Sequence, residues 1–254
     1  MQISACLWSY TETPIEAAQI AAAAGFDSID VEPGFTTAGE RQETVPVTSV
    51  AITHLLPEGT AIESDDDVAR AAAVEHAKQA LGEAHVLGAD LVYVVPAATS
   101  DPSARHYFTD SVVQLATEAE VRDIRFAIEH FPETGLPSVR DVMAFIDEVS
   151  HPNLYLLLDV GHAQISRESV GDALDMAGDR VAFVHFDDNQ GEKDDHLALL
   201  DGLMHEEDLA AAVAALRNHG YNGPVSVETN SVLSDPHAAM AGSLATLRRI
   251  VAGV

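Results

Sequence analysis

Four short segments in the second half of the sequence each end an apolar run with a carboxylate or a histidine. The segments read RFAIEH, YLLLDVGH, AFVHF and VSVET, and the residues concerned are Glu129, Asp159, His185 and Glu228. Two glutamates, one aspartate and one histidine offer three oxygen donors and one nitrogen donor, a set that suits Mn²⁺, Mg²⁺ or Co²⁺ and also accepts Zn²⁺. The alternative is that these polar side chains only close the mouth of a barrel.

The chemistry of these four residues has to be separated from a very acidic background. The chain of 254 residues has 41 acidic and 13 basic residues, for a formal net charge of −28, and only two of the basic residues are lysines. Such a charge repels nucleic-acid phosphates and anionic membranes. It resembles the surface of proteins from salt-loving organisms. Solvated surface is therefore the default interpretation of a single acidic residue, and position must identify the functional ones.

The elements that position these residues alternate along the chain. Eight apolar runs without clear polar alternation indicate parallel strands buried on both faces: Ile3–Trp8, Ser28–Val31, Ser49–His54, Leu91–Val95, Arg125–Glu129, Tyr155–Asp159, Ala182–Phe186 and Val225–Glu228. Alanine-rich stretches with helical spacing lie between most of them: Pro14–Ala24, Asp65–Leu87, Ser103–Ala119, Ser138–Val149, Glu168–Ala177, Glu206–His219 and Pro236–Val251. This order predicts an α/β fold, a single (β/α)8 TIM barrel over residues 1–254. The polar connection Pro33–Val47 predicts a degenerate second unit.

The composition favours a folded enzyme-sized domain. Hydrophobic residues make up 47% of the chain, enough for a sizeable core, and no apolar run reaches the roughly 20 residues of a membrane span. The start, MQISACLWSYTETP, has no basic region and is predicted to be a strand rather than a secretory signal. The single cysteine, Cys6, excludes an internal disulfide and is compatible with a reducing cytosol, so we expect a cytoplasmic location.

Further candidates follow from where chemistry occurs in such barrels. Active sites lie at the C-terminal ends of the strands, on the loops that lead to the helices. Beyond the four residues above, these ends carry Trp8, Glu32, His54 and His162. Trp8 is predicted to form an apolar wall. Glu32 and His54 are candidate substrate contacts, with a surface acid and a core histidine as the alternatives.

The strand-end motifs AIEH, LLDVGH, VHFDD and VSVET resemble those of the xylose isomerase-like barrels. That group contains sugar isomerases and epimerases, inosose dehydratase-like proteins and the endonuclease IV family. The resemblance covers essentially the whole chain and is strongest from Ile124 to Asn230. It implies one divalent metal ion held by the four residues named first, and it implies that His162 contacts a substrate oxygen.

A proton-transfer mechanism follows from this arrangement. A metal ion that chelates two adjacent oxygens of a hydroxy-ketone acidifies the proton between them and stabilises the enediolate. Glu129 and Glu228 are then the expected acid–base pair, and each is also a metal ligand. Return of the proton to the opposite face gives epimerisation, transfer to the neighbouring carbon gives isomerisation, and loss of a hydroxyl gives dehydration. The alternatives are that one glutamate only ligates and that His162 only supports the site.

The loops after the last strands narrow the class of substrate. The loop after Glu228 reads TNSVLSDPH and has no basic residue, and the preceding loop has Lys193 alone among acids, so we expect an unphosphorylated substrate. The segment HLALLDGLM keeps only Gly202 of a turn common in the isomerase branch. Asp194 and His196 resemble a ligand pair of the endonuclease IV branch, but VYVVPAATS has no histidine and the charge disfavours DNA.

The sequence therefore predicts a metal-dependent sugar isomerase or epimerase that acts on an unphosphorylated keto-sugar or polyol-derived substrate. A keto-sugar or inosose dehydratase on the same metal site is the alternative. DNA repair and a non-catalytic sugar-binding barrel are less favoured. His196 is expected to reach the substrate, whereas four other acids of its loop are expected to be hydrated surface: Asp187, Asp188, Glu192 and Asp195. A homo-oligomer is compatible with this group, and no nucleic-acid or membrane partner is expected.

Overall fold

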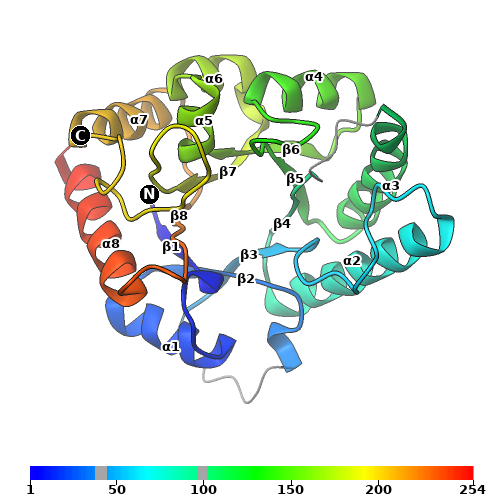
Figure 1. Ribbon diagram of the computed structural model, residues 1–254, viewed down its shortest axis with the longest axis horizontal. Helices are drawn as coiled ribbons and strands as arrows, with labels where there is room; N and C mark the ends of the chain where they lie inside the picture. The colour runs from blue at the N-terminus through cyan, green and yellow to red at the C-terminus, as the bar shows by residue number, and fades with distance from the viewer. Residues whose placement is uncertain (38–44, 97–101, 254) are drawn as a thin grey trace.

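The protein folds as a closed barrel of eight parallel strands surrounded by helices (Figure 1). A computed structural model of the chain describes residues 1–37, 45–96 and 102–253. The strands follow one another in sequence order around the barrel, and the last pairs with the first. They are β1 Ile3–Cys6, β2 Ser28–Val31, β3 Val47–Ala51, β4 Leu91–Val94, β5 Arg125–Glu129, β6 Leu154–Asp159, β7 Val181–Phe186 and β8 Val225–Val227. The prediction of a single (β/α)8 barrel is confirmed.

The helices cover the outside of the barrel. They are α1 Pro14–Ala24, α2 Asp67–Leu87, α3 Pro102–Glu120, α4 Val139–Val149, α5 Val160–Ser166, α6 Val170–Ala177, α7 Glu206–Asn218 and α8 Pro236–Gly253, with 3-10 turns η1 Leu7–Ser9, η2 Phe35–Thr37 and η3 Gly178–Arg180. The main hydrophobic core lies between these helices and the outer faces of the strands. None of the described helices is long and apolar enough to cross a membrane.

Helix boundaries follow local sequence signals. The Glu16 carboxylate accepts hydrogen bonds from the backbone and side chain of Thr13, which starts α1 ahead of Pro14. The Asp66 carboxylate accepts from the backbone of Val68 and Ala69 at the start of α2. Gly88 ends that helix in the left-handed conformation, with φ of 72°.

The second unit of the barrel is the least regular. Its described part contains only the short turn η2, in line with the expected degeneracy of the connection Pro33–Val47. Residues 38–44 of that connection lie outside the described residues. The sixth unit, by contrast, contains a helix that the sequence did not predict, α5, which begins directly where β6 ends.

The inside of the barrel is divided into an apolar and a polar half. The apolar half is a separate cluster of strand side chains, mainly Ala51, Leu91, Tyr93, Ala127, Leu157 and Phe183. The polar half comes from β8, β1, β2 and β3 and consists of Ser226, Ser4, Cys6, Ser28, Asp30 and Ser49, all buried. A hydrogen bond from Ser226 on β8 reaches Asp30 on β2 past the intervening strand β1, so these side chains face the barrel axis.

Candidate metal centre

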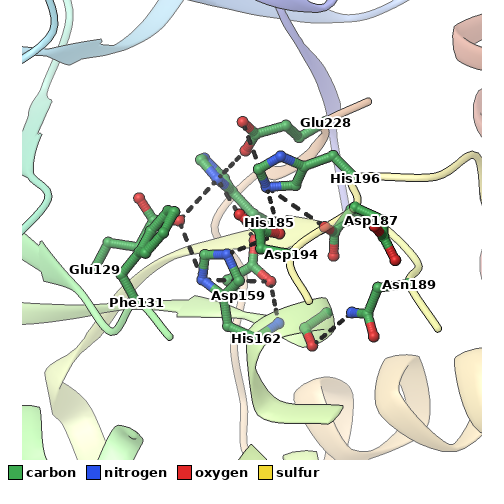
Figure 2. A network of polar contacts seen from close by, with 12 residues as sticks. Glu129, Phe131, Asp159, His162, His185, Asp187, Asn189, Asp194, His196 and Glu228 are labelled. Atoms are coloured by element: carbon green, nitrogen blue, oxygen red, sulfur yellow. Dashed lines mark hydrogen bonds and ion pairs between the residues drawn. The ribbon is translucent and has the colours of Figure 1, made fainter. Parts of the chain in front are cut away.

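The four predicted ligands converge at the mouth of the barrel (Figure 2). His185 Nδ1 lies 2.9 Å from Glu228 Oε2, 3.6 Å from Glu129 Oε1 and 3.9 Å from Asp159 Oδ2. One donor atom of each residue lies within 4.8 Å of the others, and all four residues are buried. Residues of β5, β6 and β7 and the residue directly after β8 thus form a single three-oxygen, one-nitrogen set.

The electrostatics of this set fit a divalent cation. Oδ2 of Asp159 is buried and has no hydrogen-bond partner, and burial raises the pKa of this carboxyl. Burial alone lowers the pKa of His185, but contacts with Glu129 and Glu228 outweigh it and raise that pKa well above its ordinary value. Only histidines act as cationic partners of these carboxylates among the described ion pairs. Three buried carboxylates around one imidazole need further positive charge, which a divalent ion provides.

Asp159 is fixed by the turn from strand to helix. Its Oδ1 accepts a hydrogen bond of 2.7 Å from the backbone N–H of His162, which caps the first turn of α5. The backbone N–H of Asp159 donates to His130 Nε2 at 3.1 Å. One carboxylate oxygen therefore holds the helix and the other is left for the cation. An aspartate directly after an apolar run was the available signal for this helix start.

His162 is oriented as a proton donor toward the mouth. Its Nδ1 donates to the carbonyl of His130 at 2.8 Å, so Nε2 points to Asp194 Oδ1 at 3.3 Å. The ring of Phe131 packs against it edge-on, at a centroid distance of 4.6 Å. Burial lowers the pKa of His162, but Asp159, Asp194 and Glu129 together raise it to about 10. The imidazole therefore carries a proton at neutral pH.

Two acids of the loop after β7 contradict the expectation of hydrated surface. Asp187 and Asp188 have no exposed area, whereas Glu192 is exposed as predicted and Asp195 is half-buried. The sequence pattern missed them because a loop that folds back into the mouth buries residues beyond the strand end. The side chain of Asp187 packs against residue 161, and it has room there because that residue is glycine. A Cβ at position 161 would lie 1.6 Å from Asp187 Oδ1.

The carboxylate of Asp187 has no hydrogen-bond partner and lies 3.5 Å from His196 Nε2. Burial, followed by the nearby charges of Asp159, Asp194 and Glu228, raises the pKa of Asp187 well above its ordinary value. Asp187, Asp194 and His196 also form a second group whose donor atoms lie within 4.8 Å of one another. The mouth therefore contains several buried acceptor atoms that receive no hydrogen bond from the described residues.

Asp188 organises the rest of this loop. Its two carboxylate oxygens accept backbone N–H groups from four residues of the loop at 2.8–3.2 Å: Asn189, Leu200, Gly202 and Met204. Gly202 has to be glycine, because a Cβ would lie 2.3 Å from Asp188 Oδ1. The folded loop carries His196 over the barrel, where its Nε2 lies 3.1 Å from Asp194 Oδ1 and 3.8 Å from Glu228 Oε1.

The remaining sequence candidates lie just beyond the ends of β1, β2 and β3. Trp8 is more than the predicted apolar wall, because its Nε1–H donates to Glu228 Oε1 at 2.6 Å. His54 lies three residues beyond the end of β3, edge-on to Trp8 at 5.2 Å between ring centroids. Its Nδ1 is 3.3 Å from Glu32 Oε1, and both side chains are half-buried. Glu32 and His54 therefore form a polar pair beside the candidate ligands.

Glu228 is held as a carboxylate by its neighbours. Burial alone raises its pKa, but His196, His185 and the Trp8 indole outweigh burial and lower the pKa below its usual range. Oε2 faces His185, and Oε1 faces Trp8 and His196. An ionised carboxylate with separate neighbours for each oxygen is able both to ligate a cation and to accept a proton.

His130 makes the stability of the fold depend on pH. It is fully buried, and burial together with the neighbouring His162 lowers its pKa from 6.5 to about 3. In the unfolded chain, His130 binds a proton near its ordinary pKa, whereas in the folded chain it stays neutral down to about pH 3. The contribution of neutral His130 to the unfolding free energy is therefore complete above the ordinary pKa and is lost as the pH falls toward 3. We expect the advantage of the wild type over His130→Gln in unfolding free energy to shrink by about 1.4 kcal/mol between about pH 7.5 and about pH 5.5.

Denaturant titrations of the two metal-free proteins at both pH values measure this difference. A difference that stays constant with pH would show that His130 is protonated to the same extent in the folded and unfolded chains.

The fold and the site together define a (β/α)8 barrel with a buried carboxylate–histidine donor set at its mouth. The chain belongs to the xylose isomerase-like TIM barrel family, whose model matches residues 18–250. The resemblance noted from the four strand-end motifs is thereby confirmed.

Curated relatives of the chain include two sugar-converting enzymes. The L-ribulose 3-epimerase of Methylomonas sp. (strain DH-1) is 30% identical over 168 residues, which cover 62% of this chain and 54% of the relative. The inosose dehydratase of Salmonella typhimurium (strain LT2) is 28% identical over 143 residues, which cover 48% of each chain. The chain thus spans about half the length of the curated relatives it matches.

Solved structures show the same fold at lower identity. An IOLI protein with a bound zinc atom has a TM-score of 0.80 and 18% identity, with 100% of this chain and 99% of that chain covered. A D-allulose 3-epimerase from Methylomonas sp. in complex with D-allulose has a TM-score of 0.79 and 20% identity, with 98% and 96% covered.

Proposed function

We propose that the protein is a metal-dependent sugar isomerase or epimerase that acts on an unphosphorylated keto-sugar or polyol-derived substrate through an enediolate. The observation that carries this proposal is the pair Glu129 and Glu228, two buried carboxylates at the end of β5 and directly after β8 that share one donor set with His185. The relation to the L-ribulose 3-epimerase supports it independently.

Glu129, Asp159, His185 and Glu228 would hold one divalent ion in this proposal, with Mn²⁺, Mg²⁺ or Co²⁺ favoured by the oxygen-rich set and Zn²⁺ also accepted. The bound ion supplies Lewis-acid stabilisation of the negative charge that develops on the substrate oxygens. All remaining steps belong to side chains of the chain itself.

Proton transfer is assigned to three of these side chains. Glu228, as a carboxylate, accepts a proton from the substrate carbon, and Glu129 returns a proton to the opposite face of that carbon. The Nε2 of His162 faces the mouth, and its Nδ1 is held by the His130 carbonyl, so Nε2–H is placed to donate to a substrate oxygen. Trp8 keeps the Glu228 carboxylate in one orientation through its hydrogen bond.

The polar lining of the mouth supports a hydroxyl-rich substrate. The unsatisfied carboxylate oxygens of Asp187 and Asp194 are acceptors, and sugar hydroxyls are donors that would satisfy them. A phosphate group would instead bring more negative charge to a site whose described cationic partners are histidines only. Trp8, Glu32, His54 and His196 are the further substrate contacts in this proposal, His54 and Trp8 through their rings.

A dehydratase on the same site is the second candidate. The observation in its favour is the position of His162, whose Nε2 faces the mouth, because loss of a hydroxyl as water requires an acid close to the leaving oxygen. The similarity to an inosose dehydratase points the same way. The cytoplasmic location, the absence of nucleic-acid partners and a homo-oligomeric state are also proposals, and they rest on the single cysteine, the net charge and the family.

Reaction in deuterated water distinguishes the two candidates. We expect the metal-loaded protein to convert one member of a panel containing L-ribulose, D-allulose and an inosose into a stereoisomer or positional isomer. An epimerase leaves one solvent deuterium on the inverted carbon, whereas a dehydratase gives a product lighter by one water. Mass spectrometry and NMR measure both. Failure to convert or exchange any keto-sugar of a broad panel, with metal bound, would refute both.

A further inference from the structure

The polar half of the barrel interior lies directly beneath the candidate metal centre. Interiors of such barrels are usually filled by branched apolar side chains. Here Cys6, Asp30, Ser49 and Ser226 occupy inward positions of four adjacent strands and have no exposed area. Glu228 lies two residues after Ser226, directly beyond the end of β8, and its backbone N–H still donates to Phe186 of β7, so both side chains point to the same side. The polar half is therefore continuous with the site.

Asp30 is the charged residue at the centre of this region. Its Oδ1 accepts a hydrogen bond of 3.0 Å from Ser49 Oγ, and its Oδ2 accepts a hydrogen bond from Ser226 Oγ. Cys6 Sγ lies 3.7 Å from Asp30 Oδ2 and 4.0 Å from Glu228 Oε2. A ring nitrogen of His185, a carboxylate oxygen of Asp30 and Cys6 Sγ all lie within 4.8 Å of one another. Asp30 thus lies beside one candidate ligand, His185, and is linked to a second, Glu228, through the thiol of Cys6.

The charge of Asp30 has no cation of its own. Its hydrogen-bond partners are two serine hydroxyl groups and the Cys6 thiol, and His185 is the cationic side chain that acts on it. A buried carboxylate beside this donor set is costly unless positive charge lies nearby. In the metal-free chain this charge is a source of repulsion, and in the metal-loaded chain it adds to the attraction that holds the ion.

We propose that Asp30 is a positioning residue for the metal centre, which supports His185 and strengthens cation binding from inside the barrel. This inference rests on the proposed metal-dependent function. Residues behind metal ligands fix the orientation of those ligands and raise their affinity for the ion, and their loss typically weakens binding 10- to 100-fold. Asp30 does not touch the substrate in this role, because the ligands lie between it and the mouth.

The test is Asp30→Asn, which keeps the size of the side chain and an acceptor oxygen but removes the charge. We expect the dissociation constant for Mn²⁺, measured by calorimetry without substrate, to rise about 10- to 100-fold. We expect the Tm of the metal-free variant to equal or exceed that of the wild type, because repulsion among the carboxylates is relieved. Ser49→Ala is the matched control: it removes a hydrogen bond to Asp30, keeps the charge and should leave the Mn²⁺ affinity nearly unchanged.

The outcomes separate this inference from the proposed function. A wild-type protein that binds no divalent ion overturns both. A wild type that binds Mn²⁺ with the same affinity as Asp30→Asn overturns the role of Asp30 alone. The role of Asp30 is also overturned if Asp30→Asn lowers the Tm by the same amount with and without metal and leaves the Mn²⁺ affinity unchanged. Asp30 would then serve only the packing of the barrel.

Discussion

Glu228→Gln is expected to lower kcat/KM at least about 10³-fold while the barrel remains folded. Glutamine has the shape of glutamate and still accepts the Trp8 hydrogen bond at Oε1, so the mouth keeps its packing. It cannot accept a proton from carbon, and it replaces an anionic ligand oxygen beside His185 with a neutral group. Steady-state kinetics with saturating metal, together with circular dichroism, measure the two halves of this prediction.

Glu32→Gln is the matched control for that substitution. Glu32 is a half-buried glutamate beside a histidine on the same mouth, but it is not among the four candidate ligands. We expect it to raise KM while kcat changes much less. If Glu228→Gln keeps activity within about tenfold of the wild type, the carboxylate is not the base, because loss of a general base costs more than that.

Removal of divalent metal is expected to abolish turnover and to destabilise the fold. Without the ion, three buried carboxylates remain around His185 with insufficient positive charge. An ion that binds only the folded chain, and whose free concentration is about a thousand times its Kd, adds about 4 kcal/mol to the unfolding free energy. For a chain of this size that is roughly 8–16 °C in Tm. Thermal unfolding and assays before and after chelation, with Mn²⁺ or Co²⁺ added back, measure both effects.

A second substitution provides the control for the metal effect. Asp195→Asn removes a half-buried acid of the same loop that lies outside the described donor groups, and it should keep the full response to metal. Metal analysis should give one ion per chain. Two ions per chain would contradict the single-ion assignment and would place the second at the group of Asp187, Asp194 and His196.

The sequence predicted the barrel and the main donor set because both depend on strand ends. In a parallel barrel, the C-terminal ends of all strands lie at the same face, and an apolar run that stops at a polar residue marks such an end. Glu129 and Glu228 could therefore be predicted to lie at the same face without knowledge of the loops. The family resemblance added the order of the motifs. What the structure contributes at these positions is the distances, the burial and the separate neighbours of each oxygen.

The residues that the sequence missed depend on chain paths that local patterns do not encode. Asp187 and Asp188 have the composition of a solvated turn, and only the return of the loop to the barrel buries them. Helix α5 is seven residues long, too short for a helical period to stand out beside the apolar run before it.

Asp30 was detectable in principle. Alternate residues of ISACLW and SIDVE face the same side of their strands, and this places Asp30 in line with Glu32. A strand buried on both faces, however, does not reveal which side is the interior of the barrel.

The anchoring of the β7 loop by Asp188 has a consequence for how this scaffold can change. Asp188 accepts hydrogen bonds from backbone groups on both sides of the loop and is not one of the four donor residues, so the residue that anchors the loop takes no direct part in the chemistry of the site. Between Gln190 and Leu199, Asp194 and His196 contact His162 and Glu228 and therefore belong to the site. Substitution at the other positions of this segment, with Asp188, Asp194, His196 and Gly202 retained, should change sugar selectivity while the proposed acid–base residues keep their contacts, which makes these positions the natural starting point for directed evolution.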